Sequence, residues 1–152
     1  MNANKFLFSL ALALGGTITM CFSAMAACII STTAVSFGTY DVFSPTPRDS
    51  TGSVVYRCGT DANITISLDR GGAPSFNPRR MLKGTEALDY NLYQDAARTT
   101  IWGDGTGGTQ AYFSANPPNN KDVTVTIHGR IPAGQDVSAG AYTNTVTAIV
   151  NF

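Results

Sequence analysis

The side chains best suited to chemistry in this sequence are one histidine, a few aspartates and three cysteines. His128 could serve a catalytic triad only beside a serine nucleophile and a carboxylate, and no Gly-x-Ser-x-Gly segment supplies that serine. Asp89 and Asp95 could act as the paired carboxylates of a glycosidase, although aspartates are more common on strand and turn surfaces. We therefore predict that the protein is not an enzyme and uses no cofactor.

A glycine-rich segment at residues 103–108 fits the Gly-x-Gly-x-x-Gly pattern of dinucleotide-binding loops. Such a loop needs a strand before it and a helix after it, and no part of the chain shows a sustained helical period. No Lys-Ser or Lys-Thr pair follows, as a phosphate-binding loop requires, and Asp104 lacks the spaced acidic partners of a calcium loop. The segment is therefore predicted to be a plain loop.

The charged side chains are balanced, with 10 basic and 10 acidic residues among 152. No basic patch stands out, so nucleic acid is not an expected partner. Arg79 and Arg80 could together bind an anion, but we expect their aliphatic stems to cover apolar surface instead. A zinc site is not expected from Cys28, Cys58 and the distant His128, so no metal is predicted.

The first 26 residues predict export. A short basic segment ending at Lys5 precedes an apolar run at residues 6–22, and Ala24 and Ala26 are the small residues that a signal peptidase recognises. The run is short and interrupted by glycine and threonine, which disfavours a stable membrane anchor. We predict a cleaved signal peptide over residues 1–26, cut between Ala26 and Ala27, and one domain over residues 27–152.

Cleavage would remove Cys21 and leave Cys28 and Cys58 in the mature chain. An even pair of cysteines in an exported protein is typical of one disulfide. Closing a loop of this length would stabilise the fold by roughly 3–4 kcal/mol in the chain-entropy description. Two buried thiols, or lipidation of Cys28, are the alternatives.

Alternation of apolar and polar residues dominates the rest of the sequence. It is present at residues 35–40, 53–58, 63–68, 88–92, 110–113 and 123–128. A period of two places one side-chain face on a core and the other toward water. Clusters of glycine, proline, asparagine and serine separate these segments. The pattern predicts an all-β sandwich or barrel.

Residues 141–152 form the last and longest strand pattern. Its mostly apolar face carries Tyr142, Val146, Ala148, Val150 and Phe152. Ile149 is the apolar exception on the threonine-rich face. We assign this segment the sixth position of the sandwich, whereas an immunoglobulin-type sandwich has seven strands. A sandwich one strand short would expose backbone groups and an apolar groove, which a strand from another chain could fill. Closure by a local segment, such as the first strand, is equally open on the residues alone.

The order of short motifs resembles the spore coat protein U domain family, which includes subunits of archaic-type chaperone–usher pili. Phe-Gly-Thr-Tyr at residues 37–40 is similar to the family's Phe-Gly-x-Tyr element, and Cys58 closes the next strand, as in the family. Residues 88–95 resemble its Leu-x-Tyr-x-Leu-Tyr-x-Asp strand, and residues 102–105 resemble its Trp-Gly-Asp-Gly turn. The resemblance covers residues 28–152.

The resemblance implies an incomplete immunoglobulin-like β-sandwich that lacks its last strand. The implied partners are a periplasmic chaperone that lends a strand, an outer-membrane usher, and other pilus subunits, one of which replaces the chaperone's strand. The implied product is a cell-surface fibre or coat that supports adhesion and biofilm formation. Cys28 and Cys58 would join the first two strands. The acceptor groove would be lined by Val35, Phe37, Val146, Ala148, Val150 and Phe152.

One feature departs from the fibre-forming members of the family, whose N-terminal extension serves as the donor strand. Here Cys28 directly follows Ala27, the expected first residue after cleavage. We therefore expect a chain that accepts a strand and has little to donate. This favours a tip or terminal subunit, or a non-polymerising coat protein.

A second interpretation is a secreted binding module, namely a self-complete sandwich that recognises a carbohydrate or a host surface. It would need an exposed aromatic cluster, and the candidates are Trp102, Tyr112 and Phe113. Such a protein would fold and bind as an isolated monomer.

Overall fold

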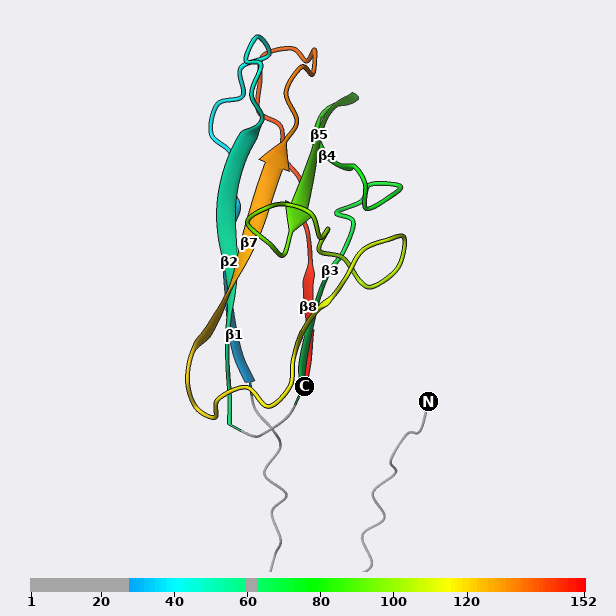
Figure 1. Cartoon of the computed structure of the whole chain (residues 1–152). Coiled ribbons are helices and arrows are strands. Elements are labelled where there is room, and N and C mark those ends of the chain that lie inside the picture. The colour runs from blue at the N-terminus through cyan, green and yellow to red at the C-terminus, as the bar shows by residue number, and fades with distance from the viewer. Residues whose placement is uncertain (1–27, 60–62) are drawn as a thin grey trace, which may run out of the picture.

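The computed structural model describes residues 28–59 and 63–152, which form strands, turns and loops. The predicted signal peptide over residues 1–26 and its cleavage site between Ala26 and Ala27 lie outside the described residues. Within the described ranges, no helix has the length and hydrophobicity that a membrane span requires. The prediction of an all-β sandwich is confirmed, because the strands form two antiparallel sheets (Figure 1).

The larger sheet has the strand order β1-β2-β7-β5-β4, and the smaller sheet has the order β6-β3-β8. Figure 1 shows β1, β2 and β7 side by side in one layer and β3 beside β8 in the other. The bounds are β1 Cys28–Thr33, β2 Arg48–Cys58, β3 Ile64–Leu68, β4 Arg79–Lys83, β5 Glu86–Tyr93, β6 Tyr112–Ser114, β7 Val123–Ile131 and β8 Ala148–Asn151.

The core is made by the inward faces of the strands that the alternating pattern predicts. In β3, Ile64, Ile66 and Leu68 are at most 2% exposed, and the residues between them are half-buried. In β2, Val54 and Tyr56 are buried in the same alternating way. Because successive side chains of a strand point to opposite faces, a period of two in the sequence becomes one buried face.

Two of the eight strands found in residues 28–59 and 63–152, namely β1 and β4, carry no alternating pattern and are not predicted by the sequence. After Cys28, every residue of β1 is exposed, so no core selects apolar residues at alternate positions. β4 forms because it pairs with β5 through a tight hairpin between Lys83 and Glu86. Conversely, the strand predicted at residues 35–40 is wrong, because this segment lies outside both sheets.

Among the described residues, the last strand is eighth in chain order, so its predicted place as sixth of seven strands is wrong. The regular strand is also shorter than residues 141–152, because this segment changes partner along its length. Thr143 exchanges two backbone hydrogen bonds with Leu82 in β4, at 2.8 and 3.1 Å. Residues Ala148–Asn151 pair with β3 instead.

Trp102 joins the two sheets on the far side of β3. The side chain is fully buried. Its backbone N–H donates to the carbonyl oxygen of Leu92 in β5, and its indole N–H donates to that of Ile66 in β3, both at 2.9 Å. Beside it, the N–H of Leu68 donates to the carbonyl oxygen of Gly103 at 3.2 Å. These bonds link the smaller sheet to the larger one beside β3.

Arg79 is buried at the same junction, which the sequence did not predict. Its guanidinium donates to the side-chain oxygen of Asn91 at 2.9 Å and to the carbonyl oxygens of Trp102 and Asp69 at 2.6 and 3.0 Å. Burial lowers the pKa of Arg79. The neighbouring Arg80 remains exposed and forms an ion pair with Asp89.

Candidate strand-acceptor edge

β8 is an edge strand of the smaller sheet. One side of β8 pairs with β3 in an antiparallel register that aligns Val150 with Ile66 and Ala148 with Leu68. No strand of the described residues pairs with its other side. An unpaired strand edge is a template for a strand from another chain.

The hydrogen bonds of residues 143–147 show which backbone groups face that open side. The backbone N–H and C=O of Thr143 bond to β4, and those of Thr147 bond to Asp69 just beyond β3. Successive residues of an extended chain point their backbone groups to opposite edges. The groups that point away from β3 and β4 are therefore those of Asn144, Val146, Ala148 and Val150. We call these four backbone positions the free edge.

The side chains of the free edge point inward and are only half covered. Val146, Ala148 and Val150 pack against the core and are half-buried, whereas the aligned residues of β3 are fully buried. The burial of inward-pointing side chains therefore decreases from β3 to β8. Phe152 is 51% exposed and is not among the residues packed against the core. Its predicted place in a groove wall is therefore not supported by its packing.

The segment after β1 forms the first wall of a groove. Phe37 is buried and Val35 is half-buried, although neither belongs to a strand. Both lie over inward-facing glycines of the larger sheet. A methyl group at Gly129 would lie 2.7 Å from the Phe37 ring, and one at Gly52 would lie 2.5 Å from the carbonyl oxygen of Thr33. The two glycines thus let this segment enter the sandwich where a side chain would block it.

This segment lines one side of a groove of about 920 Å³. The first wall is made by residues 35–43, and the second wall, on the other side, is made by residues 137–144. Apolar side chains of Met81, Leu88 and Ile131 also line it. The groove reaches Asn144, where the free edge begins. Val146, Ala148 and Val150 do not line this groove, because the free edge continues from Asn144 beyond its end. An extended peptide would therefore have to leave the groove at Asn144 and run along β8 to pair with the whole free edge.

Tyr40 fixes the first wall to the segment that follows β7. Its hydroxyl donates to the carbonyl oxygen of Pro132 at 2.9 Å and accepts from the backbone N–H of Gln135 at 3.0 Å. The side chain of Gln135 in turn bonds to both backbone groups of Asp89, at 2.7 and 2.8 Å. Gly38, three residues after Val35, has a φ of 65° and turns the wall toward Tyr40.

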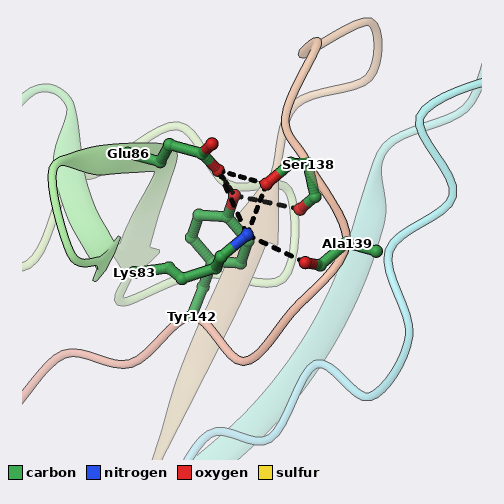
Figure 2. A network of polar contacts seen from close by, with 5 residues as sticks. All are labelled: Lys83, Glu86, Ser138, Ala139 and Tyr142. Atoms are coloured by element: carbon green, nitrogen blue, oxygen red, sulfur yellow. Dashed lines mark hydrogen bonds and ion pairs between the residues drawn. The ribbon is translucent and has the colours of Figure 1, made fainter.

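A polar cluster fixes the second wall to the β4–β5 hairpin (Figure 2). The Glu86 carboxylate accepts hydrogen bonds from the hydroxyls of Ser138, at 2.6 Å, and Tyr142. Lys83 donates to the Ser138 hydroxyl and, at 2.8 Å, to the carbonyl oxygen of Ala139. The hydrogen bonds from Ser138 and Tyr142 lower the pKa of Glu86 to about 2. The carboxylate is therefore ionised at neutral pH.

The residues considered for catalysis lie apart from this groove in local roles. Asp95 accepts hydrogen bonds from the backbone N–H groups of Thr99 and Thr100, which lower its pKa to about 2 and stabilise a turn. Asp104 accepts a hydrogen bond from the backbone N–H of Thr106 within the glycine-rich loop. His128 is half-buried in β7, aligned with Tyr93 of β5.

Cys28 and Cys58 form a disulfide that joins β1 to β2, where the two residues are aligned in register. The pairing closes 30 residues of chain. It attaches the segment that leads into the first groove wall to β2, an interior strand of the larger sheet.

The aromatic cluster required by the carbohydrate-binding interpretation is not exposed as a group. Trp102 is fully buried, and Tyr112 is half-buried with its ring centroid 6.0 Å from that of Trp102. Phe113 alone is well exposed, at 60%. These three side chains therefore offer no continuous aromatic surface.

Comparison with known proteins gives one family and two informative relatives. The model of the Spore Coat Protein U domain family matches residues 15–149. "Protein U" of Myxococcus xanthus is 32% identical over 131 residues, which cover 78% of this chain and 71% of that protein.

A similar fold occurs in the crystal structure of the CsuC–CsuE chaperone–tip adhesion subunit pre-assembly complex from archaic chaperone–usher Csu pili of Acinetobacter baumannii. The TM-score is 0.62 and the sequence identity is 27%. The match covers 84% of this chain and 40% of that chain, so this chain spans about two fifths of the length of the solved one.

Proposed function

Because the chain belongs to the Spore Coat Protein U domain family, we propose that it is an exported subunit of a surface fibre assembled by donor-strand complementation. In this mode, a strand from another chain pairs with an open sheet edge and places side chains in a groove. The process is one of association, with no covalent bond made or broken.

The observation that carries the proposal is the free edge beside an apolar groove. The free edge consists of four alternate residues from Asn144 to Val150, which direct their backbone groups away from β3 and β4. Each backbone hydrogen bond that a donor strand adds there would contribute about 0.5–1.5 kcal/mol. A donor strand would pair these groups and cover the half-buried Val146, Ala148 and Val150 at once.

The proposed partners follow from the same edge. A periplasmic chaperone would supply the first donor strand, and a neighbouring subunit would replace it during passage through an outer-membrane usher. The solved relative from Acinetobacter baumannii is titled as a chaperone–subunit complex of a chaperone–usher pilus, which supports the chaperone and subunit partners. Export through the periplasm, directed by residues 1–26, and a final place at the cell surface are part of this proposal.

The proposal has a finer part. The fibre would support adhesion and biofilm formation, and this subunit would occupy a tip or terminal position in it. The same solved complex is titled as containing a tip adhesion subunit, which supports a terminal position.

The experiment compares thermal unfolding of the chain, purified from periplasmic extract, with and without a donor peptide. The peptide alternates valine and threonine and is long enough to pair from Asn144 to Val150. Binding to the folded state alone raises the melting temperature as peptide concentration rises. A control peptide with proline at alternate positions cannot donate its N–H groups and should have no effect. Cooperative unfolding at a high temperature that neither peptide changes would refute the proposal.

A further inference from the structure

The second groove wall is held by side-chain contacts that involve none of the four free-edge residues. Ser138 and Tyr142 lie on the chain before β8, whereas Lys83 and Glu86 lie at the turn of the β4–β5 hairpin (Figure 2). These pairs are 52 to 56 residues apart in sequence. The contacts therefore tie two distant parts of the chain together at one end of the groove.

Every polar group at the centre of this cluster has a partner. The Tyr142 hydroxyl lies between the Glu86 carboxylate and the carbonyl oxygen of Ser138. The Lys83 ammonium contacts the Ser138 hydroxyl, the Ala139 carbonyl oxygen and, at 3.5 Å, Glu86. It also lies 5.7 Å from the centroid of the Tyr142 ring. The donors and acceptors of the cluster bond to one another. We therefore expect the cluster to fix the conformation of the second groove wall.

The main chain of the wall also fits the Lys83 side chain closely. Gly140 has a φ of 153°, and a methyl group there would lie 2.6 Å from the Lys83 side chain. Tyr142 lines the groove and is the first inward-pointing residue of the row that continues to Val150. The position of its ring therefore depends on the contacts of Lys83 and Glu86.

We infer that Lys83, Glu86, Ser138 and Tyr142 form a clamp that holds the 137–144 wall in the shape that accepts a donor strand. This inference rests on the proposed function and assigns the four side chains a positioning role, with no direct contact to the donor required. When only a fraction of molecules has the accepting shape, the apparent affinity falls by that fraction. The clamp keeps that fraction high.

The test measures binding of the alternating valine–threonine peptide to wild-type protein and to the variants Glu86→Gln and Tyr142→Phe. Both variants keep the size of the side chain. Tyr142→Phe removes the hydroxyl that bonds to Glu86, and Glu86→Gln removes the negative charge that strengthens the hydrogen bonds from Ser138, Tyr142 and Lys83. We expect each to weaken peptide binding about fivefold, near the lower end of typical coupling between sites. The loss should fall on the association rate, with the dissociation rate unchanged, because the bound state has the same wall.

Asp95→Asn is the matched control. Asp95 is another carboxylate whose hydrogen bonds lower its pKa to about 2, but they stabilise a turn that does not line the groove. This variant should lose stability without losing peptide affinity. Amide hydrogen exchange of residues 137–144 should accelerate in Glu86→Gln and remain unchanged in Asp95→Asn.

The outcomes separate the two ideas. Wild-type protein that does not bind the peptide would overturn the proposed function, and the clamp with it. Wild-type protein that binds, together with unchanged association rates in both clamp variants, would overturn the clamp alone.

Discussion

The indole N–H of Trp102 donates to the carbonyl oxygen of Ile66 in β3 at 2.9 Å and so occupies a backbone group on the side of β3 that faces away from β8. Ile66 is aligned with Val150 on its other side. The backbone groups of Val150 point away from β3, to the side of β8 where no strand of the described residues pairs. β3 is thus bonded on both of its sides, whereas β8 has no strand of the described residues on its outer side.

The inward face of β8 should control donor binding, whereas its outward face should not. Val150→Thr places a hydroxyl among half-buried apolar side chains, and we expect peptide affinity to fall about tenfold. Ile149→Thr is the matched control, because Ile149 is 51% exposed on the opposite face and should tolerate the change. Isothermal titration of both variants with the alternating peptide tests this. Equal losses for the two variants would mean that the donor does not enter on the inward face.

The close approach of the first wall should make Gly52 intolerant of a side chain. In Gly52→Ala, the new methyl group would lie 2.5 Å from the carbonyl oxygen of Thr33, which is backbone and cannot rotate away. We expect a loss of about 1–3 kcal/mol in the free energy of unfolding, as for other overpacked cores. Gly59→Ala is the control, since its methyl group would meet only Asn120 at 3.6 Å. Urea unfolding of the two variants should therefore differ clearly, and similar stabilities would contradict the described packing.

Arg79 should be required for the junction between the sheets. Arg79→Met removes donors to Asn91 and to the carbonyl oxygens of Trp102 and Asp69 and leaves these buried acceptors without their partner. We expect the free energy of unfolding to fall by about 3 kcal/mol, given typical costs for unsatisfied buried groups. Arg80→Met removes an exposed ion pair with Asp89 and should cost under about 1 kcal/mol. A smaller loss for Arg79→Met than for Arg80→Met in denaturant unfolding would be inconsistent with this junction.

Acid should weaken the clamp in a defined pH range. The pKa of Glu86 falls from an ordinary value of 4.5 to about 2 in the folded protein, through hydrogen bonds from Ser138 and Tyr142 and the nearby charge of Lys83. The folded state therefore favours the ionised carboxylate. Its contribution to stability is fully present above about pH 5 and is lost as the pH falls toward 2.

Melting curves between pH 6 and about pH 2 provide the measurement, with the wild type compared against Glu86→Gln. Asp95 also titrates in this range, so both proteins should lose stability on acidification. The difference between them isolates Glu86 and should shrink steadily below about pH 5. A difference that stays constant down to pH 2 would show that Glu86 has no depressed pKa in the folded state.

Much of the fold could be predicted because its signal is local. The alternation at residues 63–68 and 123–128 directly reports a buried face, and β3 and β7 form there. β1 and β4 escaped prediction because their place depends on partners, namely the disulfide to β2 and the hairpin to β5. A period-two pattern also cannot distinguish a strand from an extended segment that pairs with no other strand. Residues 35–40 were wrongly expected to be a strand for this reason.

The candidate site was only partly within reach of the sequence. The row at Val146, Ala148 and Val150 could be identified from alternation, and Phe37 as a wall residue from the motif that contains it. Ionic and hydroxyl contacts across more than 50 residues leave no local pattern, so the cluster around Glu86 could not be found. The buried role of Arg79 was hidden for the same reason, because its partners come from three separate segments.

The most direct measurement of the open edge is residue-resolved amide hydrogen exchange along residues 143–151, with and without the donor peptide. In the protein alone, the amides of Thr143 and Thr147, which have hydrogen-bond acceptors, should be protected. Those of Asn144, Val146, Ala148 and Val150 should exchange quickly. Addition of peptide should slow exchange at these four positions and leave the threonines unchanged. Slow exchange at Val146, Ala148 and Val150 in the isolated monomer would show that the edge is already paired and would contradict the account.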